Sequence, residues 1–82
     1  MTFIRQQQEA ISDLFTHAFE YNASNQVLYK GDAAAGSSKA GPVWRIAKFT
    51  YDANQSVTDI QWASGTADFQ FIWNSRITYT YT

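Results

Sequence analysis

Residues 43–51 have the sequence Val-Trp-Arg-Ile-Ala-Lys-Phe-Thr-Tyr, the longest run of strand-forming residues in the chain. The run is rich in aromatic and β-branched residues and contains neither glycine nor proline, which is typical of a β-strand. Alternate side chains of a strand point to opposite faces. Both faces here carry large apolar groups, and each also carries one cation, Arg45 or Lys48. This pattern predicts a central strand that is covered on both faces, with the two cations at its rim.

Shorter alternating segments flank the central strand. Residues 15–21 alternate with period two, residues 22–25 have the composition of a turn, and residues 26–30 are strand-forming up to Gly31. A loop of small residues over 32–41 then leads to Pro42. After the central strand and a second turn, residues 57–63 again favour a strand, which Ser64-Gly65 ends.

A faint internal repeat relates residues 19–27 to residues 49–57. The two segments share the pattern F-x-Y-[ND]-A-x-x-x-V, thirty residues apart. Each copy contains an incoming strand, a turn opened by an Asx side chain and a returning strand. The repeat predicts two similar hairpins, although chance similarity between hairpins explains it as well.

The C-terminal third changes period twice. Phe69, Ile72 and Trp73 have the i, i+3, i+4 spacing of a helix, which predicts one or two helical turns within residues 66–76. Residues 77–82 alternate cleanly and predict a final strand. The fold class expected is mainly β: a five-stranded antiparallel sandwich or barrel-like sheet built from two hairpins and this C-terminal strand.

The N-terminal segment differs from the rest. Residues 2–14 favour a helix whose apolar side chains fall near one face, with Gln7 and Gln8 interrupting the stripe. A helix of this length is marginal in isolation, so it needs a partner surface. Two readings stay open, a helix packed on its own domain and an arm that docks on another chain. We therefore divide the chain into a helical arm over residues 1–14 and a β domain over residues 15–82.

Composition limits the possible functions. Eighty-two residues without cysteine form one small domain that no disulfide stabilises, so association is the remaining way to add stability. Aromatic residues make up 17% of the chain and charged residues 16%, a balance that suits protein–protein contact, and we expect a homo-oligomer. The net charge is −1 without a basic patch, which argues against nucleic-acid binding. No apolar run approaches the length of a membrane span, and the N-terminus lacks the apolar core of a signal peptide.

Candidate chemical sites are weak. The spacing Gly31-x4-Gly36-x4-Gly41 resembles a phosphate loop but lacks its Gly-Lys-Ser/Thr ending. The segment 52–56 has oxygen-bearing side chains at alternate positions, like the start of a calcium loop, but it lacks the glycine at position six and the closing glutamate of such a loop, and a hairpin turn explains the same residues. His17 is the single histidine, and its place on an aromatic strand face indicates a packed or rim residue. We therefore expect no enzyme activity, no metal site and no cofactor.

The part of the chain from Val27 onward resembles a group of short virion-associated proteins of tailed bacteriophages. The resemblance is carried by ordered blocks: residues 27–31 with the following small-residue loop, residues 44–46 and 48–52, residues 57–63 with Gly65, and Phe69 with residues 72–76 and the Thr-Tyr end. It covers about two thirds of the chain and leaves out the N-terminal helix. It implies no catalytic residue.

This resemblance implies a non-enzymatic structural protein of the virion, assembled in the bacterial cytoplasm from many copies and in contact with other virion proteins. We expect a connector or joint in the neck, tail or fibre apparatus; a capsid decoration (cement) protein and a soluble host-directed binding module are the alternatives. The contact surface is expected to comprise apolar residues of the arm, the central strand and the C-terminal strand: Phe3, Ile4, Ile11, Leu14, Trp44, Ile77, Tyr79 and Tyr81.

Overall fold

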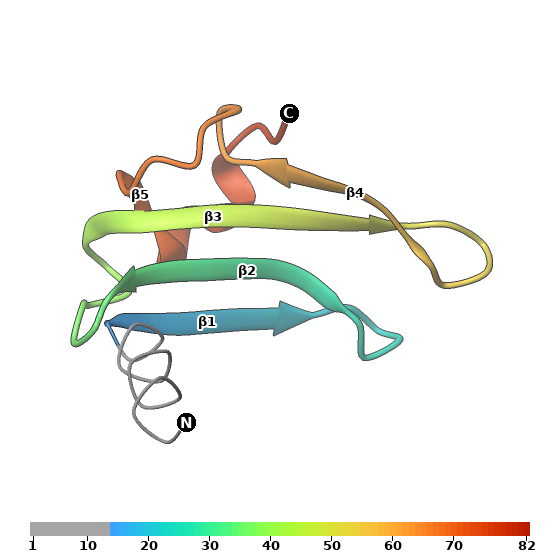
Figure 1. The fold of residues 1–82 in the computed structure, drawn as a ribbon, viewed down its shortest axis with the longest axis horizontal. Coiled ribbons are helices and arrows are strands. Elements are labelled where there is room, and N and C mark those ends of the chain that lie inside the picture. The colour runs from blue at the N-terminus through green and yellow to red at the C-terminus, as the bar shows by residue number, and fades with distance from the viewer. Residues whose placement is uncertain (1–13) are drawn as a thin grey trace, which may run out of the picture.

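The computed structural model describes residues 14–82, which form a five-stranded antiparallel sheet (Figure 1). The mainly β class and the two hairpins are confirmed. The helix predicted over residues 2–14 lies outside the described residues, apart from Leu14. The elements in chain order are β1 (Phe15–Tyr21), β2 (Val27–Ala34), β3 (Pro42–Tyr51), β4 (Val57–Trp62), β5 (Phe71–Ile72) and the 3-10 helix η1 (Trp73–Thr78).

Strand pairing places β3 at the centre. The strands lie in the order β1-β2-β3-β4, and β5 pairs with the first residues of β3. The longest strand-forming run in the sequence is thus the strand with the most partners. Its register with β2 aligns Gly31 with Ile46, and its register with β4 aligns Phe49 with Ile60.

The two hairpins turn in the same way, as the internal repeat predicts. The Oδ1 atoms of Asn22 and Asp52 each accept two backbone N–H groups from the turn that follows, at 2.8–3.0 Å. Asn25 and Gln55 occupy the same left-handed position, with φ of 62° and 68°. A bulge precedes each turn, at Glu20/Tyr21 and at Thr50/Tyr51. The side chain that opens each turn therefore sets its geometry locally, which is why the sequence alone could predict it.

Strand β2 extends four residues beyond the predicted end at Lys30, through Gly31 to Ala34. A glycine within a strand marks a close approach of another group. A Cβ on Gly31 would stand 2.6 Å from Cε3 of Trp73 and 3.0 Å from Cε3 of Trp44. The prediction that Gly31 ends the strand was therefore wrong, because the glycine makes room for two indole rings.

The C-terminal third differs most from expectation. The short helix predicted within residues 66–76 is present in part: residues 66–70 form a loop, β5 follows, and the 3-10 helix η1 begins only at Trp73. The strand predicted over residues 77–82 is absent. Ile77 belongs to η1, and Tyr81 makes an isolated bridge to Ala63. The fifth strand of the sheet is the short β5 and not the predicted C-terminal strand. In β5, Phe71 pairs with Trp44 near the start of β3.

This C-terminal segment covers one face of the sheet, behind β3 in the view of Figure 1. On that face, here called the covered face, Trp44 and Ile46 are fully buried, and the small residues Gly31 and Ala33 lie beside them. The aromatic side chains that pack on or into this core come mainly from residues 71–81: Phe71, Trp73, Tyr79 and Tyr81. The hydrophobic core thus joins the first two hairpins to the last twelve residues.

Candidate functional site

The opposite face of the sheet, here called the open face, is the most distinctive surface of the described chain. No helix or strand among residues 14–82 lies in front of it (Figure 1). The register places the following side chains on it: Phe15, His17, Phe19, Lys30, Asp32, Val43, Arg45, Phe49, Ile60 and Trp62. Phe19 is 48% exposed and Ile60 is 52% exposed. On the central strand itself, Ala47 is 3% exposed and Arg45 and Phe49 are partly buried, so the prediction that both faces of this strand are covered is wrong on the open face only near its start, where Val43 is 39% exposed.

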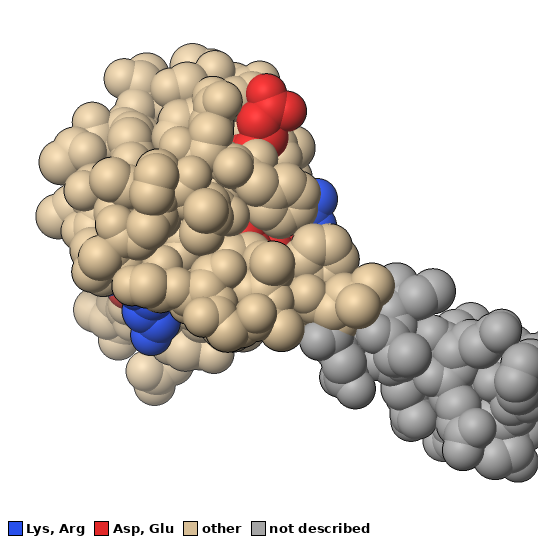
Figure 2. Space-filling model, turned by 90° about the vertical axis from the view of Figure 1, so that its left-hand side faces the viewer, with Lys and Arg blue, Asp and Glu red and all other residues tan. Residues whose placement is uncertain are grey.

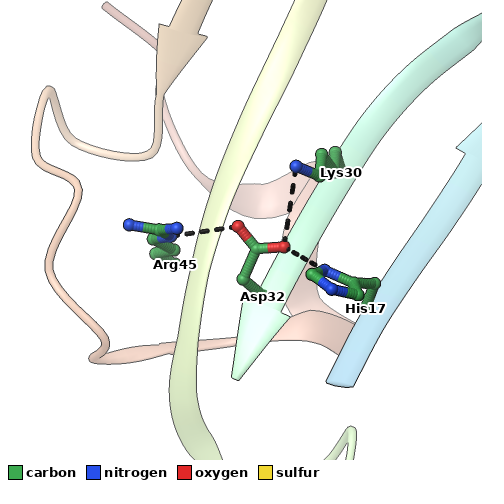
Figure 3. A network of polar contacts seen from close by, with 4 residues as sticks. All are labelled: His17, Lys30, Asp32 and Arg45. Carbon is green, nitrogen blue, oxygen red and sulfur yellow. Dashed lines mark hydrogen bonds and ion pairs between the residues drawn. The ribbon is translucent and has the colours of Figure 1, made fainter. Parts of the chain in front are cut away.

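A polar network crosses three strands of the open face and centres on Asp32 (Figure 3). One carboxylate oxygen lies 2.6 Å from Nδ1 of His17, and the other accepts a hydrogen bond from Nε of Arg45 at 3.0 Å. Nζ of Lys30 lies 3.8 Å from the carboxylate. Asp32 is only 4% exposed, whereas its basic partners reach solvent. The network therefore holds one buried anion among half-exposed groups that are, or can become, cationic.

Burial by itself would raise the pKa of the Asp32 carboxyl. The hydrogen bonds to His17 and Arg45, together with the positive charges of Lys30 and Arg45, act in the opposite direction and hold the pKa of Asp32 below its usual range. Asp32 is therefore an ionised structural anchor at neutral pH. It fixes the positions of the basic groups on an otherwise apolar surface.

Arg45 connects this network to aromatic rings at one end of the open face. Its guanidinium carbon lies 4.9 Å from the ring centroid of Phe69 and 5.8 Å from the ring centroids of both Phe15 and Trp62. Phe15 and Phe69 stack at 5.8 Å. Cation–π contact of this kind holds the Phe69 loop against the sheet. Phe69 reaches the open face from a segment predicted to be helical. Trp73 instead packs into the core of the covered face, so the helical spacing of the two residues does not place them on one helix face.

A shallow apolar pocket of about 360 Å³ adjoins these rings, lined by Phe15, Ala34, Ser37, Val43 and Phe69. The side of the domain that bears this end of the sheet shows few charged side chains (Figure 2). Phe15 and Val43, which line this pocket, belong to the open face, so the pocket continues that face at the start of β1.

Among the described residues predicted to form the contact surface, three meet in the core of the covered face and not at an exposed surface. Trp44 is 1% exposed and lies in the core. Tyr79 and Tyr81 are half-buried against that core. Tyr79 packs edge-on against Phe71, and the Tyr81 hydroxyl donates to the carbonyl of Arg76. Burial raises the pKa of Tyr81.

Two of the predicted contact residues remain at the described surface, Leu14 and Ile77, which are 63% and 74% exposed. Phe3, Ile4 and Ile11 lie outside the described residues.

The structure also bears on the candidate phosphate loop and calcium loop. Gly31 lies buried inside β2, so the three glycines do not share one phosphate-binding loop. Asp52 uses its side chain to cap the hairpin turn, as the turn interpretation expects. Among the described residues there is no group of three or more His, Asp or Glu side chains placed to hold a metal, and no helix long and apolar enough to cross a membrane.

Neither the position of Asp32 at the centre of a network nor the open face as a surface is predicted from the sequence. The predicted strand over residues 26–30 ends at Gly31, which places Asp32 in the predicted loop over residues 32–41. Its partners lie 15 and 13 residues away along the chain, on β1 and β3. His17, Asp32 and Arg45 all lie in segments that can form strands, which is the one indication in the sequence. Only the strand register shows that they face each other.

No protein-family model, curated protein or solved structure that was compared with this chain matches it.

Proposed function

We propose that this protein is a non-enzymatic structural subunit that works by docking its open face against another protein. The observation that carries this proposal is that several large apolar side chains on that face are exposed, including Phe19, Val43, Ile60 and Phe69. An exposed large apolar side chain adds nothing to the stability of a monomeric domain, whereas a contact surface gains much of its binding energy from such side chains.

The polar network suits the same role. A contact surface needs polar groups with fixed positions to define orientation, and the carboxylate of Asp32 fixes Arg45 and His17 within a field of aromatic rings. Arginine and aromatic residues are enriched at protein interfaces. The open face therefore offers apolar area for affinity and a few oriented donors for specificity.

The particle in which we propose this docking is the virion of a tailed bacteriophage, in many copies, at a joint of the neck, tail or fibre apparatus. This part of the proposal rests on the ordered residue blocks from Val27 to the C-terminus. A capsid decoration protein uses a docking face in the same way, and its position in the particle distinguishes it. A soluble host-directed binding module would act outside the particle altogether.

The proposal is tested with two serine variants in a complementation assay. Phe19→Ser alters the open face, and Ile77→Ser removes a still more exposed apolar side chain from η1, away from that face. We expect both purified variants to fold, as judged by circular dichroism. We expect Ile77→Ser to enter particles normally and Phe19→Ser to be depleted from them, as measured by mass spectrometry of purified virions.

Three outcomes would contradict parts of the proposal. Normal incorporation of Phe19→Ser would exclude its side chain as a docking anchor, and selective loss of Ile77→Ser would move the docking surface to η1. Absence of the unaltered protein from purified particles would exclude the virion role. A cryo-EM map of the intact particle would then separate a neck, tail or fibre position from a capsid position.

A further inference from the structure

The outer edge of β1 carries backbone groups that the described fold does not use. We propose that β1 pairs antiparallel with β1 of a second copy of this chain, across a two-fold axis at His17. This inference deepens the proposed docking function, because it names one partner and the strand through which it binds.

The hydrogen-bonding pattern identifies the free backbone groups. The Leu14 carbonyl accepts the N–H of Ala35 at 3.0 Å, and this pair continues the register in which Phe15 aligns with Ala34. In an antiparallel ladder, such hydrogen-bonded pairs recur at every second residue. Residues 14, 16, 18 and 20 therefore direct their N–H and C=O groups toward β2. Those of Phe15, His17 and Phe19 point away from the sheet, and β1 has no partner on that side among residues 14–82.

The same three residues place their side chains on the open face, which makes the edge self-complementary. When His17 aligns with His17 of the second copy, Phe15 aligns with Phe19 of that copy, and Phe19 with its Phe15. Directly opposed aromatic side chains stabilise an antiparallel pair. Each phenylalanine already has an aromatic neighbour in its own chain, since Phe15 stacks on Phe69 and Phe19 on Tyr21. The dimer thus joins two aromatic rows across the axis.

The shape of β1 selects this register. The bulge at Glu20/Tyr21 ends the regular ladder, so the usable edge runs from residue 15 to residue 20 and is centred near His17. Strand edges that avoid pairing usually carry lysine or proline, and Phe15–Tyr21 contains neither. A symmetric dimer uses the same patch on both copies, and a strand paired antiparallel with itself meets that requirement.

The opposite edge of the sheet is less available. At the end of β4, Trp62 exchanges two backbone hydrogen bonds with Thr82, and the N–H of Ser64 donates to Thr80. The C-terminus of the chain therefore occupies part of that edge itself. No described segment does the same for β1. The two open faces become continuous when the β1 edges pair, which doubles the surface available for a further virion protein.

Amide hydrogen exchange and particle mass test the proposal on the unaltered full chain. We expect twice the chain mass by sedimentation, and slow exchange at the amides of Phe15, His17 and Phe19. In a mixed-isotope sample we expect a close intermolecular contact between the Hα atoms of Thr16 and Ala18, because these residues oppose each other as a non-hydrogen-bonded pair. A mass of one chain overturns the proposal. If the three amides exchange slowly in such a monomer, residues 1–13 and not a second copy would be the partner of the β1 edge. A dimer in which the three amides exchange freely also overturns it.

A charge variant tests the axis. His17→Lys gives Asp32 a lysine partner but opposes two lysines at the two-fold axis, so we expect the dimer dissociation constant to rise at least about threefold. Val57→Lys is the matched control, since Val57 is about as exposed as Phe19 and begins β4, away from the β1 edge. An equal effect of both variants, or none from His17→Lys, contradicts pairing at this axis. If the protein is a monomer and changes to the open face still prevent its incorporation into particles, the β1 pairing is wrong and the proposed docking function stands.

Discussion

The two faces of one sheet are built on different principles. On the covered face, β3 presents Trp44 and Ile46 to indole and phenyl rings from the C-terminal segment, and these side chains are buried. On the open face, Arg45 of the same strand bonds to a buried carboxylate and Val43 lines a pocket with Phe69; Val43 is exposed, and Arg45 and Phe49 are partly exposed. We infer that the covered face supplies most of the stability of this domain and that the open face is maintained for contact.

Truncation of one large ring on each face gives the largest contrast. We expect Trp73→Ala, on the covered face, to lower the free energy of unfolding by about 3–5 kcal/mol, because the ring is 4% exposed and a cavity would replace it. That loss approaches the whole stability of a small domain. Phe69→Ala, on the open face, should cost about 1 kcal/mol, since its ring is 43% exposed. Urea denaturation measures both, and equal losses would contradict the contrast between the faces.

A single methyl group added to the covered face should also lower the free energy of unfolding. In Gly31→Ala the new Cβ meets two indole rings at 2.6–3.0 Å, so we expect a loss of about 1–3 kcal/mol from overpacking. Gly41→Ala is the control, because its nearest neighbour would lie at 3.4 Å and its backbone is not left-handed. A neutral Gly31→Ala would show that Trp73 and Trp44 can move apart without cost.

The anchor of the open face predicts a pH dependence. Because the pKa of Asp32 is lower in the folded state than in the unfolded state, its ionised form stabilises the fold at pH values above the ordinary Asp pKa of about 3.9. This stabilisation is lost as the pH falls through the lowered pKa. Asp32→Asn should lower the free energy of unfolding at neutral pH by about 1–3 kcal/mol and should flatten the acid limb of the stability curve. An unchanged acid limb in the variant would assign the pH dependence to other carboxyl groups.

The smallest effect is expected at the most exposed apolar side chain among those described. Ile77→Ser should change the free energy of unfolding by less than about 0.5 kcal/mol, because Ile77 is 74% exposed on η1. Thermal or urea unfolding measures this. A loss above 1 kcal/mol would show that Ile77 is buried in the intact protein, by residues 1–13 or by another chain.

Local sequence alone determined the two hairpins of this protein. Asn22 and Asp52 set their turns by bonding to backbone groups within four residues, and the alternation of β1 and β3 follows from neighbouring residues. Such interactions need no distant partner, so the sequence pattern predicts them.

Only the tertiary structure decided the C-terminal third and the anchor of the open face. The helical spacing of Phe69 and Trp73 was overridden because one ring stacks on Phe15 of the open face and the other packs into the core of the covered face. Asp32 became an anchor because strand register placed it between residues of β1 and β3. Contacts between residues so far apart along the chain depend on how all the strands align, and no local pattern contains that alignment.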